Sequence, residues 1–186
     1  PLYGYKIALD SLAAFAIADH MGLDLLEVRD SFKDLMGIRR RFEFKLDTSE
    51  IKVIEDYAHH PREIQEVIRT VRGYFRPYRL IVAFQPHRYT RTKSLWEEFK
   101  YCFRGADILF ITDIYPAFEE EIEGISSQRL ANELVGMNGI YVEKGKLVEQ
   151  LLKVVHKGDI ILVLGAGDIN EICDPLVNEL KTWLIS

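Results

Sequence analysis

The feature that most constrains the fold is an alternation, from about residue 48 onward, of short apolar runs with amphipathic segments. The runs are rich in Ile, Val, Leu and aromatic residues and lack polar alternation, which is typical of strands buried in a parallel sheet. The segments between them have helical periodicity. This order predicts an α/β fold with a doubly wound, mostly parallel sheet of about five to six strands. The expected strands are 51–55, 80–84, 108–112, 139–142 and 160–164, and the expected helices are 62–74, 94–104, 127–136, 145–156 and 169–184.

The first part of the chain has a different pattern. Apolar residues at helical spacing predict two helices, over 5–19 and 24–35, joined at Gly22. Three arginines at 39–41 then interrupt the pattern, and we expect a domain boundary within 44–48. The predicted organisation is a helical segment with a hinge, 1–46, followed by the sheet domain, 47–186.

Composition narrows the class of protein. The 186 residues are 48% hydrophobic and 28% charged, as in an ordinary globular protein with one good core. The net charge of -5 argues against nucleic-acid binding, and no apolar run reaches membrane-spanning length, so neither kind of partner is expected. Cys102 and Cys173 lack metal-ligand spacing, which favours reduced thiols in a core, a cytoplasmic location and no metal site. The chain begins at Pro1 without a signal segment, so we expect it to be part of a longer protein.

Three of the expected strands end in polar clusters, at 56–61, 85–92 and 165–168. The carboxyl ends of parallel strands meet at one edge of a sheet, so we expect the clusters to form a pocket there. In the first, Asp56 precedes His59 and His60 at a helix start, a usual arrangement for holding a charged ligand. In the second, Arg88 and Arg91 can bind a phosphate or carboxylate through bidentate hydrogen bonds. The alternatives are a helix-capping or surface role for either histidine and a solvated loop for the basic cluster.

The third cluster, Gly165-Ala166-Gly167-Asp168, is expected to let the backbone approach a ligand closely, with Asp168 capping the last helix. It is not a dinucleotide fingerprint, because it follows the last strand and lacks the Gly-x-Gly-x-x-Gly spacing. The sequence also contains no Gly-x-x-x-x-Gly-Lys-Ser/Thr phosphate loop, so the chain should not hydrolyse ATP alone. An arginine of the run at 39–41 can reach a nucleotide held elsewhere, with a charged linker as the alternative. The acidic run at 119–121 is expected to be a solvated loop.

Six blocks of the sequence, in matching order, closely resemble the Mur ligase family. The segment Gln-Pro-His-Arg-Tyr-Thr-Arg-Thr at 85–92 is typical of its alanine-adding members, whereas the tripeptide-recycling members usually differ there. The resemblance covers the carboxy-terminal domain and the last helices of the central ATP-binding domain. It implies a Rossmann-like sheet preceded by two helices from the end of that central domain. The six blocks are 37–43, 56–61, 84–92, 112–117, 124–127 and 165–168.

The resemblance implies ATP-dependent amide formation in peptidoglycan precursor synthesis. The carboxylate of UDP-N-acetylmuramate takes the γ-phosphoryl group of ATP, and the amine of L-alanine then attacks the acyl phosphate. The implied partners are these two substrates and the upstream N-terminal and central domains of the same polypeptide. ATP and Mg²⁺ are expected to bind mainly to those upstream domains, so the chain is expected to be inactive alone.

The resemblance also implies roles for particular residues. By motif position, the residues that hold the substrate carboxylate and orient alanine are Tyr57, His59, Arg88 and Arg91. Of these, His59, Arg88 and Arg91 are the expected catalytic residues. Arg41 and Asp56 resemble residues that face the nucleotide.

One departure from the family pattern lies near the start of the chain. The family normally carries a His-Asn pair and a second Asn three residues on, and the matching positions here are Lys6, Ile7 and Asp10. We assign no nucleotide role to these three residues. The departure slightly favours an alternative function, a stand-alone anion-binding module that does no catalysis. A tripeptide-recycling Mur ligase is a further alternative.

Overall fold

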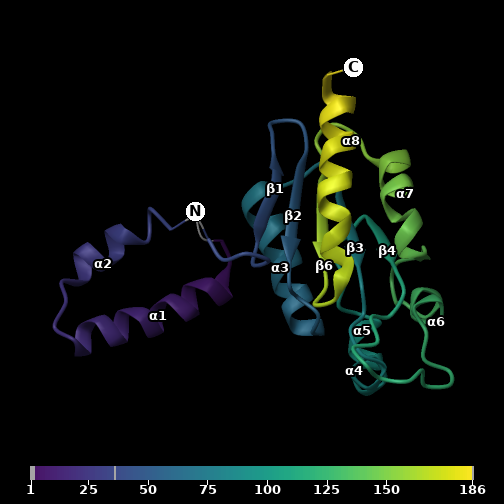
Figure 1. Cartoon of the computed structure of the whole chain (residues 1–186), viewed down its shortest axis with the longest axis horizontal. Coiled ribbons are helices and arrows are strands. Elements are labelled where there is room, and N and C mark those ends of the chain that lie inside the picture. Colours follow the sequence, from purple (N-terminus) through teal and green to yellow (C-terminus); the bar gives the residue numbers. More distant parts are fainter. Residues whose placement is uncertain (1–2, 36, 186) are drawn as a thin grey trace.

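The computed structural model describes residues 3–35 and 37–185, apart from the side chains of Tyr5, Lys6 and Ile185. Its described residues form one six-stranded sheet in the order β1-β2-β6-β3-β4-β5 (Figure 1). Only the β1–β2 pair is antiparallel, so the expected doubly wound, mostly parallel sheet is confirmed. The strands are β1 (Glu43–Asp47), β2 (Lys52–Asp56), β3 (Leu80–Phe84), β4 (Ile108–Ile111), β5 (Gly139–Tyr141) and β6 (Ile160–Leu164).

Helices cover both faces of the sheet, as the alternation predicts (Figure 1). One face packs against α3 (Pro61–Phe75), α5 (Trp96–Phe99) and α6 (Ser127–Asn132), and the short helix α4 (Tyr89–Ser94) directly precedes α5. The other face packs against α7 (Leu147–Val154) and α8 (Cys173–Ile185), which follow the short 3₁₀ helices η1 (Lys144–Lys146) and η2 (Asp168–Ile172). Because both faces are covered, every residue of β3 and β6 is buried.

Strand β1 was not expected, since its residues alternate in polarity and do not form an apolar run. Only Leu46 of this edge strand is buried, and Phe44 is half-buried. The expected boundary between residues 46 and 47 falls inside β1, although β1 pairs with β2 and belongs to the sheet. Four helices also differ from expectation. The helix expected at 94–104 begins at Tyr89 and is interrupted at Leu95, and those expected at 24–35 and 127–136 end at Ser31 and Asn132. The helix expected at 169–184 begins as the 3₁₀ helix η2 and becomes α-helical at Cys173.

Helix α3 begins where its sequence signals predict. His60 is the N-cap in a capping box with Glu63, and Pro61 occupies the first turn, where its missing N–H is harmless. Ile64, Ile68 and Val71 are buried along one face. This start places the His59–His60 backbone directly at the end of β2.

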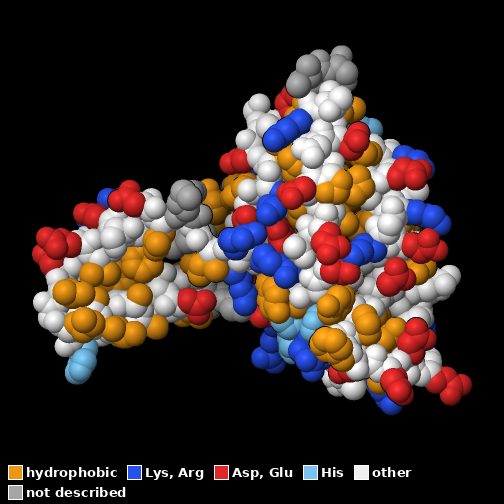
Figure 2. Space-filling view, viewed as in Figure 1, with side chains coloured by type: hydrophobic (Ala, Val, Ile, Leu, Met, Phe, Trp, Pro, Cys, Tyr) orange, Lys and Arg blue, Asp and Glu red, His pale blue; other side chains and the backbone are white. Residues whose placement is uncertain are grey.

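Helices α1 (Tyr5–His20) and α2 (Leu25–Ser31) form a hairpin that projects away from the sheet (Figure 1). The two helices contact each other through the stacked rings of Phe15 and Phe32, 5.4 Å apart. Most of the hairpin's large apolar side chains are nevertheless exposed, as the orange atoms along it show (Figure 2). At its base, Tyr3 packs against an aromatic cluster made by Phe42, Phe44, Tyr74 and Phe75.

Both cysteines are buried, which confirms their expected place in the core. Burial raises the pKa of the Cys102 thiol and raises the pKa of the Cys173 thiol to about 12. Within the described residues, no helix combines the length and apolar character needed to cross a bilayer.

An ion pair between the half-buried Arg79 and the buried Asp159 links the amino ends of β3 and β6, the ends opposite the polar clusters. Arg79 donates two hydrogen bonds to Asp159, at 3.0 and 2.6 Å, and the His156 backbone N–H donates a third at 2.7 Å. Asp159 is only 1% exposed. We expect Asp159→Ala to lower the free energy of unfolding by about 3 kcal/mol, because it leaves Arg79 without its buried partner. Urea denaturation followed by circular dichroism measures this change.

The matched control is Glu50→Ala, which removes an exposed ion pair with Lys157. Exposed pairs contribute about 1 kcal/mol or less, so this variant should differ little from the wild type. Equal losses of unfolding free energy in the two variants would show that burial of Asp159 does not determine how much its ion pair with Arg79 stabilises the fold.

Candidate functional site

The candidate site lies where three adjacent parallel strands end. Asp56, Leu164 and Phe84, the last residues of β2, β6 and β3, are register partners across the sheet. The chain leaves β2 and β3 toward the α3 face and leaves β6 toward the α8 face. Such a divergence of connections opens the crevice in which doubly wound sheets bind ligands. The expected meeting of the three polar clusters at one edge is therefore confirmed.

Asp56 holds the first cluster in shape. Its carboxylate is 7% exposed and accepts hydrogen bonds from the backbone N–H groups of Phe42 and Ala58, both at 2.8 Å. Burial raises the pKa of Asp56, although the two N–H groups act in the opposite direction. The Tyr57 N–H also donates to the Arg40 carbonyl at 2.7 Å. The segment that precedes β1 is thereby fixed to the loop that follows β2.

Two histidines of the site have opposite tautomers. His59 Nδ1 lies 3.0 Å from the Tyr57 carbonyl oxygen, which only accepts, so Nδ1 carries the hydrogen and Nε2 the lone pair. His87 Nδ1 lies 3.0 Å from Arg91 Nη1, which only donates, so in neutral His87 the hydrogen is on Nε2. The two rings are 5.8 Å apart. In the neutral forms, His59 Nε2 therefore can accept a hydrogen bond or a proton, and His87 Nε2 can donate a hydrogen bond.

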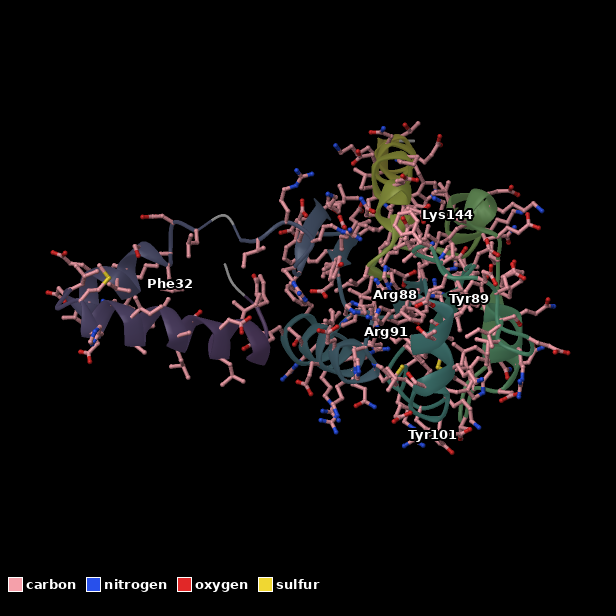
Figure 3. The ribbon with its side chains drawn as sticks, turned by 60° about the horizontal axis from the view of Figure 1, so that its bottom comes forward. Phe32, Arg88, Tyr89, Arg91, Tyr101 and Lys144 are labelled. Carbon is pink, nitrogen blue, oxygen red and sulfur yellow. The ribbon has the colours of Figure 1, made fainter. Side chains whose placement is uncertain are left out.

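Arg88 and Arg91 come together on an open, basic cleft of about 430 Å³, which His60, Thr90, Ser94 and Leu95 also line. Figure 3 shows the two arginines side by side, far from Phe32 on the hairpin. The Arg88 guanidinium is exposed, and within the described residues no hydrogen bond or ion pair holds it. Arg91 is held through His87. This arrangement can bind an anion with one fixed and one adjustable guanidinium.

Arg41 and Asp56 line a second, mostly apolar cleft of about 380 Å³ at the base of the hairpin. Ile7 and Asp10, two of the positions that depart from the family pattern, line the same cleft. The side chain of Lys6, the third position, lies outside the described residues. The Tyr57 ring lies 5.3 Å from the His59 ring and 5.3 Å from the Arg41 guanidinium, but neither Tyr57 nor His59 lines either of the two clefts.

The glycines of the third cluster have a different role from the one expected. A Cβ on Gly167 would lie 2.5 Å from Gln85 Oε1 and 2.6 Å from the Tyr115 ring. A Cβ on Gly165 would lie 2.8 Å from Ile169. The loop is therefore glycine-rich because the protein packs against it, and these contacts leave no space for a ligand at either Cα.

Asp168 is not the expected helix cap. It makes no side-chain capping bond to η2 in the described structure, and it accepts instead from Gln85 Nε2 at 2.8 Å and from Lys144 Nζ at 2.5 Å. Gln85 Oε1 accepts from the Ile169 N–H at 3.0 Å. The Gln85 side chain thus ties the end of β3 to the loop after β6. The acidic run at 119–121, expected to be a solvated loop, is held at one residue. Glu119 accepts hydrogen bonds from the backbone N–H and the hydroxyl of Thr90.

Comparison with known proteins gives the family. The family model described as "Mur ligase, glutamate ligase domain" matches residues 40–167. The chain belongs to the Mur ligase family. The matched range begins before β1 and includes the first two polar clusters and residues 165–167 of the third.

Among the family's members, the UDP-N-acetylmuramate--L-alanine ligase of Syntrophobacter fumaroxidans is 40% identical over 183 residues, 96% of this chain and 39% of that protein. The crystal structure of the UDP-N-acetylmuramate-alanine ligase MurC from Thermotoga maritima matches 96% of this chain and 38% of its own, with a TM-score of 0.78 and 28% identity. The chain therefore spans about two fifths of the length of these relatives.

A single ligase domain from Haemophilus ducreyi, crystallised by itself, matches 75% of this chain and 99% of its own length. Its TM-score is 0.54 and its identity 23%, so this likeness concerns the fold alone.

Three further residues, which the sequence pattern does not single out, contact residues of the site in the structure. His87 and Tyr115 stack with ring centres 5.4 Å apart, and both lie in blocks that resemble the Mur ligases. Arg40 contacts the Tyr57 ring at 5.0 Å, whereas the sequence pointed to its neighbour Arg41. Strand-end position could have drawn attention to His87 and Tyr115. Nothing in the arginine run distinguishes Arg40 from the residues beside it.

We expect Gly167→Ala to displace Tyr115 and Gln85, because the added methyl has no room. Overpacking of this kind destabilises by about 1–3 kcal/mol. Urea denaturation measures the loss, and the NMR signals of the His87 ring should shift, since His87 stacks on Tyr115. Gly145→Ala is the matched control, because nothing lies within 4 Å of its added Cβ. Unshifted His87 signals in Gly167→Ala would contradict the packing argument.

The two histidines also predict a pH dependence of stability. Burial first, and then the charge of Arg91, lower the pKa of His59 and of His87. The unfolded chain, with histidine pKa values of about 6.5, therefore binds more protons below that pH than the folded chain does. The free energy of unfolding should fall as the pH is lowered from about 7.5 to about 5.5.

Denaturation at a series of pH values checks this dependence. A double variant, His59→Asn with His87→Asn, should lose less stability over the same range, because its two asparagines do not titrate. Identical pH profiles of the variant and the wild type would rule out the two histidines as the source.

Proposed function

We propose that the chain is the carboxy-terminal portion of an ATP-dependent ligase that joins L-alanine to UDP-N-acetylmuramate. The observation that carries the proposal is the 40% identity, over nearly the whole chain, to a UDP-N-acetylmuramate--L-alanine ligase. The basic cleft of Arg88 and Arg91, with His87 bonded to Arg91, supports it. A cytoplasmic location and a place in peptidoglycan precursor synthesis are parts of the same proposal.

In this proposal Arg88, Arg91, Tyr57 and His59 hold the muramoyl carboxylate and orient alanine. The reaction passes through an acyl phosphate and then a tetrahedral intermediate, and both carry negative charge that guanidinium groups stabilise. Arg91 is positioned for this by its bond to His87, and Arg88 can move to follow the charge. When the amine attacks the carbonyl carbon, it must lose a proton as phosphate departs. His59 Nε2, with its lone pair, is the group that we assign to accept it.

Arg41 and Asp56 face the nucleotide in this proposal. The cleft that they line, with Ile7, offers apolar walls of the kind that take a flat base. The Asp56 carboxylate already accepts two backbone hydrogen bonds, so its first effect is to shape the wall of this cleft. ATP supplies the phosphoryl group and Mg²⁺ balances its charge; we assign both mainly to the upstream domains. The described residues contain no group of three or more potential His, Cys, Asp or Glu ligands for a metal.

We further propose that the hairpin is the end of the central ATP-binding domain and that the second domain starts before β1. No residue of α2 is buried, and nine large apolar side chains near the hairpin are exposed: Leu9, Leu12, Ile17, Met21, Leu23, Leu25, Leu26, Leu35 and Ile38. An exposed apolar surface of this extent is typical of an interface. The Haemophilus ducreyi domain, which covers 75% of this chain and 99% of its own length, supports a division of the chain into a larger and a smaller part.

The reading frame upstream of Pro1 tests the proposal directly. It should encode a Gly-rich phosphate loop, and a start codon close to Pro1 would instead favour the non-catalytic anion-binding module. The protein encoded by the whole frame should form the amide with L-alanine faster than with glycine or L-serine in single-turnover assays. Equal rates would refute the alanine assignment, and activity only with a tripeptide would favour the recycling ligases.

In that whole protein, Arg88→Ala and Arg91→Ala should each lower kcat/KM by about one to three orders of magnitude, as expected for a lost charge-assisted bond. Lys93→Ala is the matched control, since Lys93 is an exposed cation on the same helix, α4. Steady-state kinetics with UDP-N-acetylmuramate measures the effect. Wild-type kinetics in either arginine variant would remove that arginine from the proposed site.

A further inference from the structure

Arg40 occupies a strained position in the turn that joins the hairpin to the sheet. The Arg41 N–H donates to the Ile38 carbonyl at 3.0 Å, which closes a turn over 38–41. Within it, Arg40 has a φ of 59°, in the left-handed region that turns usually fill with glycine or asparagine. A non-glycine residue persists there only when its surroundings hold it, at a cost of about 1–3 kcal/mol.

The Arg40 side chain provides that hold, and it reaches both loops of the site. Nε donates to Glu55 Oε1 at 2.8 Å, and Nη2 donates to the carbonyls of Gly165 and Gly167, both at 2.9 Å. The guanidinium also lies 5.0 Å from the centre of the Tyr57 ring. The Glu55 side chain is 3% exposed, so its charge requires this partner and Lys45, 3.3 Å away.

The contacts continue from Arg40 to the anion cleft. Gly167, whose carbonyl Arg40 binds, packs against Gln85 and Tyr115. Tyr115 stacks on His87, and His87 accepts from Arg91. In the other direction, the Arg40 carbonyl accepts from the Tyr57 N–H, two residues before His59.

We propose that Arg40 is a positioning residue: it holds the Tyr57–His59 loop and the Gly165–Gly167 loop in the arrangement that forms the site. A shift of the turn at 38–41 moves its guanidinium and so changes both loops at once. The turn at 38–41 is thereby linked to both loops of the site through the Arg40 side chain. The inference rests on the proposed function only for the identity of the ligand that these loops hold.

Hydrogen exchange of the whole 186-residue chain, measured by NMR, tests the proposal without any ligand. In Arg40→Gly, glycine accepts the backbone conformation of the turn while the guanidinium is lost. The Tyr57, Gly165 and Ile169 amides, which donate to Arg40, Asp56 and Gln85, should exchange about tenfold faster, as expected for a lost net hydrogen bond. The Thr112 amide, which donates to Phe84 within the sheet, should be unchanged.

The histidine titrations give a second readout. The main charges that act on the pKa of His59 are those of Arg91, Glu63 and His60, and on the pKa of His87 those of Arg91, His59, Arg88 and Glu119. Arg40 is not among these charges, so its removal should change the two pKa values by displacing the loops. Both pKa values should rise toward 6.5 in Arg40→Gly.

Two further variants make the test decisive. Arg39→Ala removes a neighbouring exposed cation of the same turn and should leave the exchange rates and titrations unchanged. Arg40→Lys keeps the charge but cannot bond to Glu55 and two carbonyls together, so it should restore the wild-type rates only in part.

Wild-type exchange in Arg40→Gly, full rescue by lysine, or equal acceleration at Thr112 would each overturn the proposal. If Arg40→Gly does not fold, the lysine variant decides. None of these outcomes depends on amide-forming activity, which the turnover assays test separately.

Discussion

The parallel pairing of β2, β6 and β3 is the constraint on which the site depends. It brings Asp56, Leu164 and Phe84 to one edge in register, so that three loops distant in the sequence begin side by side. Strands β3 and β6 are wholly apolar, whereas β2 ends in two buried carboxylates, Glu55 and Asp56, so most of the polar groups of the site lie at or beyond the strand ends. A one-residue slip of β6 would exchange its two faces and destroy both cores. The same register that maximises burial therefore fixes where the polar loops lie.

Beyond the strand ends, packing and hydrogen bonds leave little freedom. Gly167 fits against Gln85 and Tyr115 without space for a methyl group, and Gln85 bonds to both Asp168 and Ile169. Polar groups buried in such a loop must be satisfied by one another, because water cannot reach them. The outcome is a closely packed loop base beside the half-buried side chains of His59, His87 and Arg91 and the exposed guanidinium of Arg88. Such preorganisation suits a site that must stabilise charge at the moment it develops.

The sequence predicts the buried parts of this structure well. The bounds of β3 and β6 agree with the expected runs to the residue, because a strand buried on both faces must be apolar along its length. Strand β1 could not be predicted in this way, because an edge strand has one half-exposed face. Its mixture of Glu43, Phe44 and Lys45 resembles a linker. Arg88, Arg91 and His59 could be chosen from the sequence as candidate site residues, because each is a cationic or titratable side chain that follows shortly after a predicted strand. The roles of Gly165, Gly167 and Asp168 could not be predicted from the sequence. These roles depend on Tyr115, Gln85 and Lys144, which lie 20 residues or more away along the chain.

The arginine run at 39–41 shows most clearly where sequence reasoning ends. All three residues are long cations in one turn, and pattern alone treats them alike. In the structure Arg39 is exposed, Arg41 lines the apolar cleft, and Arg40 turns inward to Glu55 and two loop carbonyls. Their different directions follow from the left-handed backbone at Arg40 and Phe42, which orients successive side chains toward different parts of the molecule. A backbone conformation that is unfavourable by itself thus gives three identical residues three different environments. The favourable bonds of the middle residue are what maintain that conformation.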